Sequence, residues 1–416
     1  MNEASLSRIG LVQVRSEGPP RILTLHRYFP MAFLYVFVNS AGLPNGLFLT
    51  GILAPAFYLY LLLHRQRWVT LWFLALLVPF LVAHSILGID SPIFYARSTL
   101  LLWTAYITGY FFCWALLRTQ SLERLFDELI IANFVAAILA LVLLPTPARV
   151  LFWDNEADVI GASHLYRLRL LTSEPSVYGA LLIPLVVFAT LRLMQTPGKR
   201  SFCFALMIAL PFLLCQSFEG IGSFFISIGV ATLVSFRHLL KRRRNIAVLV
   251  LLTVCVAALV AIPNPISQRL TQVVNGEDSS AHSRTIFSFL VAYAVASSKS
   301  LWWGAGLGQG KLVDVSNLGL SFVTGVIPNA TAGTFAELGI IGMTLRFAVE
   351  ITLFFRTRVF ANPFRLAMFV VAFAYQLSGS YLNNVQEYLM WCFAFGPFLP
   401  EMDRRHSLLE KRNAES

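Results

Sequence analysis

Charged residues are scarce in this sequence of 416 residues. They make up 13% of the chain, whereas hydrophobic residues make up 57%, and the mean hydropathy is +0.69. Soluble globular domains contain about 25% charged residues, so this balance excludes a soluble fold. The composition predicts a polytopic integral membrane protein of the all-α class, in which residues 1–416 form a single transmembrane domain.

Closely paired cysteines are also missing. The five cysteines lie in apolar runs, and none forms a C-x-x-C pair. Neither a disulfide framework nor a zinc site is therefore expected. The acidic residues and histidines of the polar segments are scattered along the chain. We expect no metal and no cofactor.

Long apolar runs dominate the sequence instead. A helix of about 20 residues crosses the hydrocarbon core of a bilayer, and twelve runs are counted as spans on this basis. The predicted spans are residues 28–42, 46–63, 68–87, 99–117, 126–144, 176–194, 201–216, 219–236, 246–262, 332–355, 364–380 and 385–400.

Lys and Arg are unevenly distributed between the two sides of these spans. Most of the 32 fall on one side if the spans alternate, and positively charged loops stay in the cytoplasm. Both termini are therefore predicted to be cytoplasmic. The loop 145–175 and the large loop 263–331, which has an embedded helix before the tenth span, are then predicted to face the opposite, outer side of the membrane. The net charge of +11 then reflects membrane anchoring, and no nucleic acid is expected as a partner.

Three arginines in these two intervals are candidate anion ligands: Arg167, Arg169 and Arg284. A guanidinium group presents a planar fork that matches phosphate oxygens. A diphosphate is therefore the expected ligand. The alternative is that these arginines contact lipid headgroups or nearby carboxylates such as Asp154.

Two further residues are candidates for acid–base or hydroxyl chemistry. Glu174 precedes Pro175 at the start of the sixth predicted span, where its carboxylate could bind a sugar hydroxyl or take its proton; the alternative is a capping role. His282 lies two residues before Arg284, and its unperturbed pKa of about 6.5 suits a general base. The alternative for His282 is a loop residue with no catalytic role.

The segment GAGLGQGK at 304–311 resembles a nucleotide-binding loop but lacks its pattern. Ala305 stands where a P-loop needs glycine, and Leu312 stands where it needs Ser or Thr. We instead expect Gly304, Gly306 and Gly308 to let the backbone turn closely back toward the membrane.

Charged residues inside predicted spans are costly and therefore informative. Arg346 and Glu350 are four residues apart and are expected to pair on one helix face. Glu337 lies near the outer end of the same span, where it could face a reaction chamber, and Glu387 is similarly placed on the twelfth span.

Three segments carry a resemblance to a known family. They are RLRLLTSEPSVYG at 167–179, HSRTIFSFLVAYAVASSKSLWWGAGLG at 282–308 and NATAGTFAELGIIG at 329–342. With their order and spacing, the chain resembles the bacterial O-antigen polymerase and ligase superfamily over most of its length, and it is most similar to the exopolysaccharide repeat-unit polymerases.

The resemblance implies an enzyme of the bacterial inner membrane with a periplasmic, metal-independent active site. It implies that Arg167 and Arg284 contact the diphosphate of an undecaprenyl-linked oligosaccharide, with Arg169 nearby. Tyr178, Asn329 and Glu337 lie in the same segments and are candidate substrate-binding residues.

The expected function is the polymerisation of undecaprenyl-diphosphate-linked repeat units into exopolysaccharide or O-antigen. Ligases of this superfamily have histidine directly before the matching asparagine, where this chain has Pro328, which favours a polymerase. The alternatives are a ligase that transfers glycan to a lipid or protein acceptor, and a flippase or exporter of lipid-linked glycan. The expected partners are membrane lipids and a chain-length regulator and flippase of the same pathway.

Overall fold

The structure is a computed structural model of the chain. It describes residues 42–43, 47–66, 68–118, 122–155, 166–234, 267, 271–272, 275, 279–313, 327–379, 381–399 and 402. The predicted first and ninth spans, apart from Gly42, lie outside these residues.

Helices make up most of the described chain. In chain order they are α3 (Leu49–Leu63), α4 (Trp68–Leu87), α5 (Pro92–Arg118), α6 (Leu122–Leu143), α7 (Pro175–Gln195), α8 (Lys199–Leu214), α9 (Phe218–Val234), α13 (Ser279–Arg284), α14 (Ile286–Ser297), α15 (Ala330–Arg356), α16 (Pro363–Ser378) and α17 (Val385–Phe395). Short 3-10 helices are η2 (Pro147–Leu151), η3 (Gln309–Leu312) and η5 (Val359–Ala361).

Strands are few and short. Strand β1 (Gly42–Leu43) pairs antiparallel with β2 (Leu47–Phe48). Strand β3 (Trp153–Asn155) pairs antiparallel with β4 (Tyr166–Leu168), so that Asp154 lies opposite Arg167.

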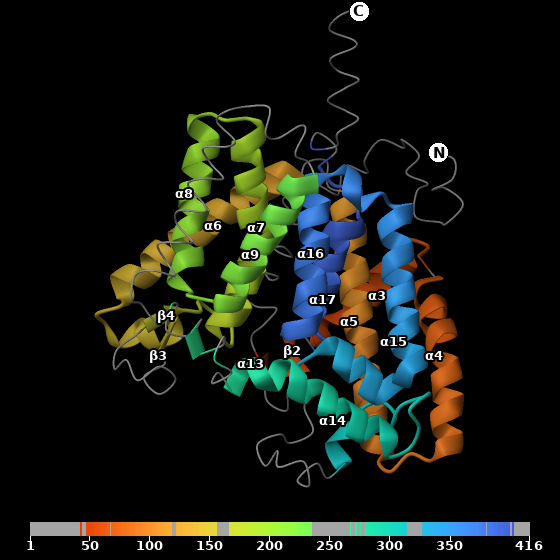
Figure 1. Cartoon of the computed structure of the whole chain (residues 1–416). Helices are drawn as coiled ribbons and strands as arrows, with labels where there is room; N and C mark the ends of the chain where they lie inside the picture. Colours follow the sequence, from red (N-terminus) through yellow and green to blue (C-terminus); the bar gives the residue numbers. More distant parts are fainter. Residues whose placement is uncertain are drawn as a thin grey trace, which may run out of the picture.

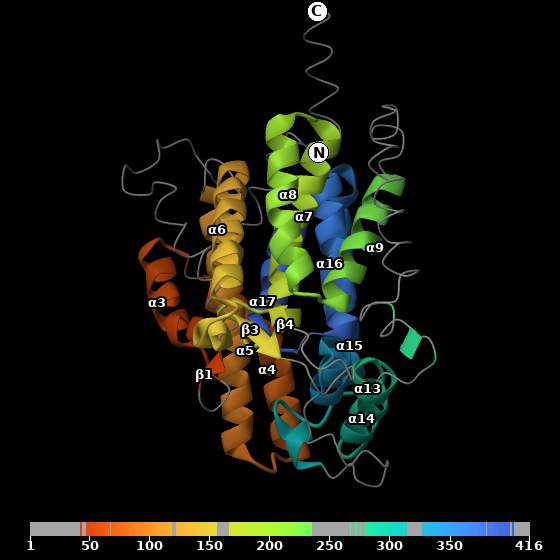
Figure 2. The same cartoon turned by 90° about the vertical axis from the view of Figure 1, so that its left-hand side faces the viewer.

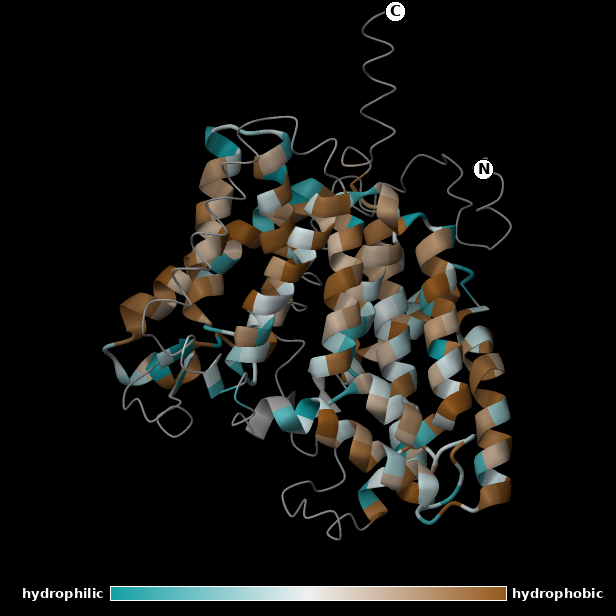
Figure 3. Cartoon of the chain, viewed as in Figure 1, coloured by the Kyte–Doolittle hydropathy of each residue, from teal (hydrophilic) through white to brown (hydrophobic). Residues whose placement is uncertain are grey.

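The prediction of an all-α membrane protein is supported by the length and surface of the helices. Among the described residues, five helices are long and apolar enough to cross a membrane: α4, α5, α6, α7 and α15. Large hydrophobic side chains along α4 and α6 are exposed, and Figure 3 shows hydrophobic residues over most of α6. Such surfaces suit contact with lipid. The count of twelve spans and their orientation stay predictions.

The helices form a bundle around α7. In the apolar 18-residue stretch of α7, 78% of the residues are buried, compared with 28% in that of α4. The main hydrophobic core draws on α6 to α9, α16 and α17, and Figures 1 and 2 place α7 between α8, α9 and α16. Helix α7 is therefore central, whereas α4 lies at the edge of the bundle.

The described parts of both polar intervals predicted from the sequence lie at one end of the bundle. Strands β3 and β4 and helices α13 and α14 gather at the end opposite the connection between α7 and α8 (Figures 1 and 2). Residues that are far apart in the sequence can therefore share one site at this end.

Three helices begin at asparagine residues. Asn329 accepts a hydrogen bond from the backbone N–H of Ala332 and begins α15. Asn362 begins α16, where Pro363 follows, and Asn384 begins α17. In each case the side-chain oxygen satisfies a backbone donor that the first helical turn leaves without a partner.

Helix α15 is broken at Gly339, where φ is 69° and ψ is −168°. The break leaves backbone groups of both halves without their helical partners. The segment 301–306 supplies them: the N–H groups of Ala305 and Gly306 donate to the carbonyls of Ala336 and Glu337, and the carbonyls of Leu301 and Trp302 accept from Ile340 and Ile341. This pairing satisfies the broken backbone within the protein, as an apolar surrounding requires.

The glycines of segment 304–308, which we call the glycine loop, make this pairing possible. Gly304, Gly306 and Gly308 all have positive φ. A Cβ on Gly304 would lie 2.4 Å from the carbonyl carbon of Glu337, and a Cβ on Gly339 would lie 2.3 Å from the carbonyl oxygen of Trp302. The prediction that these glycines permit a close backbone turn is confirmed.

We predict that Gly339→Ala strongly destabilises the protein. A left-handed backbone costs an alanine about 1–3 kcal/mol, and the contact with Trp302 adds a steric clash. Gly229→Ala in α9 is the matched control, because nothing lies within 4 Å of its added Cβ. Thermal unfolding in detergent measures both variants, and an unchanged midpoint for Gly339→Ala contradicts the proposed constraint.

Candidate functional site

A cavity of about 310 Å³ opens where the two polar intervals meet. We call it the first cavity. Its lining draws on the start of α7, on α9 and α13, and on the connection from α16 to α17. Glu174 and Arg284, both predicted site residues, line it together.

Arg284 forms an ion pair at the wall of the first cavity. Its Nη1 lies 3.1 Å from Oε2 of Glu219, and Ser378 donates to the other carboxylate oxygen at 3.1 Å. The Arg284 side chain is 31% exposed and that of Glu219 is 18% exposed. The guanidinium group of Arg284 is thus bound to Glu219 through Nη1, while part of it still faces the cavity.

Asn329 lies directly behind Arg284. Its Nδ2 donates to the carbonyl of Arg284 at 3.0 Å and to that of Leu377 at 2.6 Å, and its Oδ1 caps α15. One carboxamide therefore joins α13, α15 and α16. Its hydrogen bonds make Asn329 a residue that positions Arg284.

Glu174 occupies the N-cap position of α7 but makes no capping hydrogen bond with its side chain. Its carboxylate accepts a hydrogen bond from Ser176 at 2.9 Å and lies at the wall of the cavity. An exposed carboxylate that is not used for capping can accept a hydrogen bond from a ligand hydroxyl.

Arg167 is buried, with 4% of its surface exposed. Its Nε donates to the carbonyl of Cys215 and its Nη2 to that of Gln216, each at 3.2 Å. Arg169 donates to the carbonyls of Ser173 and Val150. Neither arginine is among the described residues that line the first cavity.

Arg167 and Arg284 nevertheless approach the same segment of the chain. Arg167 holds the turn that joins α8 to α9, and Arg284 binds Glu219 at the start of α9. The structure therefore places both arginines at the same end of the bundle, one supporting the turn and the other facing the cavity.

The remaining predicted residues are dispersed around this end. His282 is half-buried on α13, with its ring tilted against Phe287. Tyr178 is fully buried in the core and donates to Asn133 at 2.9 Å. Glu337 lines a second cavity, described below.

The connection from α16 to α17 contributes residues that our interpretation of the sequence missed. Tyr381, Asn383 and Asn384 line the first cavity, as does Gln386 at the start of α17. These residues belong to the polar stretch SYLNNVQ at 380–386, where the predicted eleventh span ends and the twelfth begins. The cluster of carboxamides at this junction is the sequence signal that could have identified them.

Burial raises the pKa of the Tyr381 phenol, while Arg284 lowers it and Glu174 raises it. The phenol therefore stays protonated at neutral pH. It can donate a hydrogen bond to an oxygen in the cavity.

Gln386 brings a buried donor to the cavity wall. Its Oε1 accepts from the Tyr375 hydroxyl at 3.1 Å, and that hydroxyl accepts from Asn384 at 3.2 Å. The chain of bonds fixes which end of the carboxamide faces Tyr375. Nε2 of Gln386 is buried and has no hydrogen-bond partner within the described residues. A buried donor without a partner is destabilising, so an oxygen of a bound molecule or of water that accepts from Nε2 would be stabilised there.

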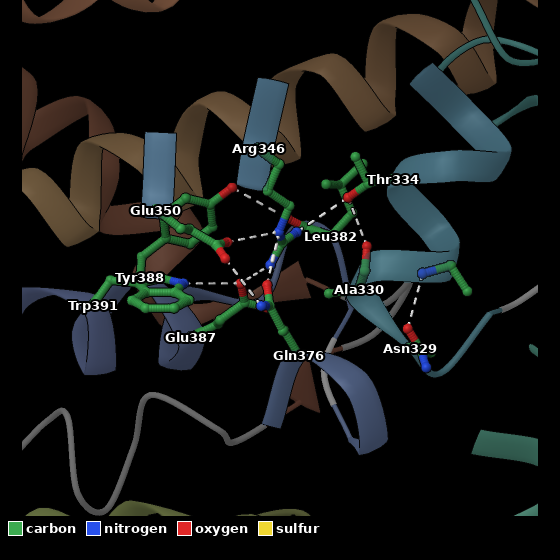
Figure 4. A network of polar contacts seen from close by, with 11 residues as sticks. Asn329, Ala330, Thr334, Arg346, Glu350, Gln376, Leu382, Glu387, Tyr388 and Trp391 are labelled. Carbon is green, nitrogen blue, oxygen red and sulfur yellow. Dashed lines mark hydrogen bonds and ion pairs between the residues drawn. The ribbon is translucent and has the colours of Figure 1, made fainter. Parts of the chain in front are cut away.

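A buried ionic network lies deeper in the bundle (Figure 4). Arg346 pairs with Glu350 at 3.2 Å, which confirms the predicted pair. Its guanidinium group also binds Glu387 of α17, Gln376 of α16 at 2.9 Å, and Thr334 at 3.1 Å. One arginine thus joins both halves of α15 to α16 and α17, directly behind the site.

No family model matches the chain, and no curated protein matches it. Within the described residues, no group of three or more His, Cys, Asp or Glu side chains could hold a metal ion. The fold and the first cavity together define an α-helical membrane protein with a polar site at one end of its bundle.

We predict that Arg346→Ala destabilises the protein by about 3–5 kcal/mol, because it leaves two buried carboxylates without their cation. The matched control is Arg124→Ala. Arg124 is 62% exposed and pairs with Glu128 on the same helix, so its loss should cost about 0.5 kcal/mol or less. Equal thermal unfolding midpoints for the two variants contradict this account of the network.

We predict that Arg167→Ala lowers stability, because each lost buried hydrogen bond leaves a carbonyl without its donor at a cost of about 1–3 kcal/mol. Arg167→Lys restores the charge but not the two-point contact, and it should rescue only part of the loss. Thermal unfolding and protein yield measure both variants. A stability equal to that of the unsubstituted protein would mean that Arg167 does not support the α8–α9 turn.

Proposed function

We propose that this protein is a membrane glycosyltransferase that polymerises undecaprenyl-diphosphate-linked oligosaccharide repeats at the periplasmic face of the bacterial inner membrane. The observation that carries the proposal is the first cavity. It lies at one end of a bundle of apolar helices and brings together Arg284, Glu174 and several carboxamides from separate segments.

The chemistry of the cavity suits a sugar linked to a diphosphate. Carboxamides, a tyrosine and carboxylates form hydrogen bonds with sugar hydroxyls. The guanidinium group of Arg284 complements a phosphate oxygen. An extended lipid chain could remain in the bilayer while its polar head enters this end of the bundle.

The proposed step is a displacement at the anomeric carbon. A hydroxyl oxygen of one repeat forms a bond to the anomeric carbon of the chain on another lipid, and the bond from that carbon to the diphosphate oxygen breaks. Glu174 accepts a hydrogen bond from the attacking hydroxyl and takes its proton as the new bond forms. Arg284 stabilises the negative charge that develops on the leaving diphosphate.

Arg167 enters this proposal as a positioning residue. Its hydrogen bonds to Cys215 and Gln216 hold the turn that precedes Glu219, and Glu219 in turn holds Arg284. The family resemblance implies a diphosphate contact for both Arg167 and Arg284, and this proposal keeps that contact for Arg284 alone.

The proposal predicts that Arg284→Ala lowers the polymerisation rate by about a hundredfold or more, because a donor to the leaving group is lost. Glu174→Gln should also lower the rate, since an amide is a far weaker base than a carboxylate. Arg149→Ala is the matched control: Arg149 is exposed in η2 at the same end of the bundle, against the ring of Tyr166.

The assay uses purified protein in lipid vesicles with a lipid-linked repeat, and thermal unfolding of each variant separates catalysis from folding. Normal chain length and yield with folded Arg284→Ala contradict the mechanism. Product attached to a lipid or protein other than undecaprenyl diphosphate favours the ligase, and movement of glycolipid without chain growth favours the exporter.

A further inference from the structure

A second cavity, of about 320 Å³, lies next to the first. Tyr381 and Asn383 line both cavities, so they form a shared wall. The second cavity is built by α5, by the glycine loop with η3, and by the first half of α15. Apart from the shared segment 381–383, these elements have no role in the proposed function.

The two cavities differ in charge. Among the described residues, the first is lined by one cation, Arg284, and two carboxylates, Glu174 and Glu219. The described lining of the second has two cations, Arg97 and Lys311, and one carboxylate, Glu337. Since opposite charges attract most strongly where water is partly excluded, the second cavity favours an anion more than the first does.

Most of the other residues that line the second cavity are apolar. Its side chains include Phe94, Leu101 and Leu102 of α5, together with Leu307, Ile327 and Leu382. Helix α5 continues from here as one of the candidate membrane spans. A ligand with an anionic head and a long apolar chain matches this combination of surfaces.

Close packing fixes the two backbone segments that carry these cations. Gly308 lies against α5, where an added Cβ would meet Oγ of Ser98 at 2.2 Å and the carbonyl of Phe94 at 2.7 Å. Gln309, which follows, exchanges two hydrogen bonds of 3.0 Å with the backbone of Ser91. The backbone that carries Lys311 is therefore fixed next to the helix that carries Arg97, before any ligand binds.

We propose that the second cavity binds the diphosphate of the acceptor, the lipid-linked repeat whose hydroxyl attacks. The inference rests on the proposed function, because polymerisation requires two lipid-linked molecules at once. The donor diphosphate lies by Arg284 and the acceptor diphosphate by Arg97 and Lys311, with the shared wall of Tyr381 and Asn383 between them. The reacting sugars of both substrates then meet in the first cavity.

The test uses the full chain in phosphatidylcholine vesicles, with two substrates that can be told apart. The donor is an undecaprenyl-linked repeat, and the acceptor is a labelled repeat on a shorter prenyl diphosphate. The double variant, which carries both Arg97→Gln and Lys311→Gln, should have a KM for the labelled acceptor that is about tenfold to a hundredfold higher. This is the loss of affinity expected when a hydrogen bond to a charged group is removed. Its kcat should change little, and Arg149→Gln should change neither value.

A second arm measures binding without turnover. A fluorescent prenyl diphosphate should bind the unsubstituted protein. Its affinity for the double variant should be tenfold or more lower, whereas its affinity for Arg149→Gln should be unchanged. Phosphatidylglycerol is the competitor that represents a membrane headgroup. If it displaces the probe as well as the labelled acceptor does, the cavity holds ordinary lipid and the acceptor assignment is wrong.

The two proposals fail in different ways. Absence of polymer with the unsubstituted protein overturns the proposed function. Normal polymerisation together with an unchanged acceptor KM in the folded double variant overturns only the acceptor site.

Discussion

The backbone pairing between the glycine loop and the break in α15 is the interaction on which the described site depends. A helix that stops inside an apolar surrounding leaves carbonyl and N–H groups that water cannot satisfy. Here the N–H groups of Ala305 and Gly306 donate to carbonyls of the first half of α15. The carbonyls of Leu301 and Trp302 accept hydrogen bonds from N–H groups of the second half. The close approach needs glycine on both sides, at Gly304 and Gly339.

This pairing determines where the polar groups lie. The first half of α15 is set apart from the second, so Asn329 at its start can reach the carbonyls of Arg284 and Leu377. The second half carries Arg346 and Glu350 into the bundle, where they bind α16 and α17 (Figure 4). The break thus separates a half that lines the second cavity from a half that anchors the site in the bundle.

The proposed chemistry uses a division of charge that the helices produce together. Among the described residues, carboxylates and carboxamides gather around one cation in the first cavity, and cations exceed carboxylates in the second. In the proposal, the first arrangement binds the reacting sugars and the donor diphosphate, and the second binds the acceptor diphosphate. Arg167 and Asn329 support this arrangement through hydrogen bonds to backbone carbonyls.

The sequence by itself determined the features that depend on local order. Low charge and long apolar runs predicted a helical membrane protein, the spacing of Arg346 and Glu350 predicted their pair, and three glycines predicted a close turn. Tertiary structure alone decided what each polar group contacts. In the folded protein, Arg167 binds the α8–α9 turn and Tyr178 is buried against Asn133. Glu387 joins the ionic network of Arg346, and the segment 381–386 lies at the first cavity. The physical reason is that the donors of a guanidinium or carboxamide group can bind either a ligand or a backbone carbonyl, and the neighbours supplied by distant segments select between them.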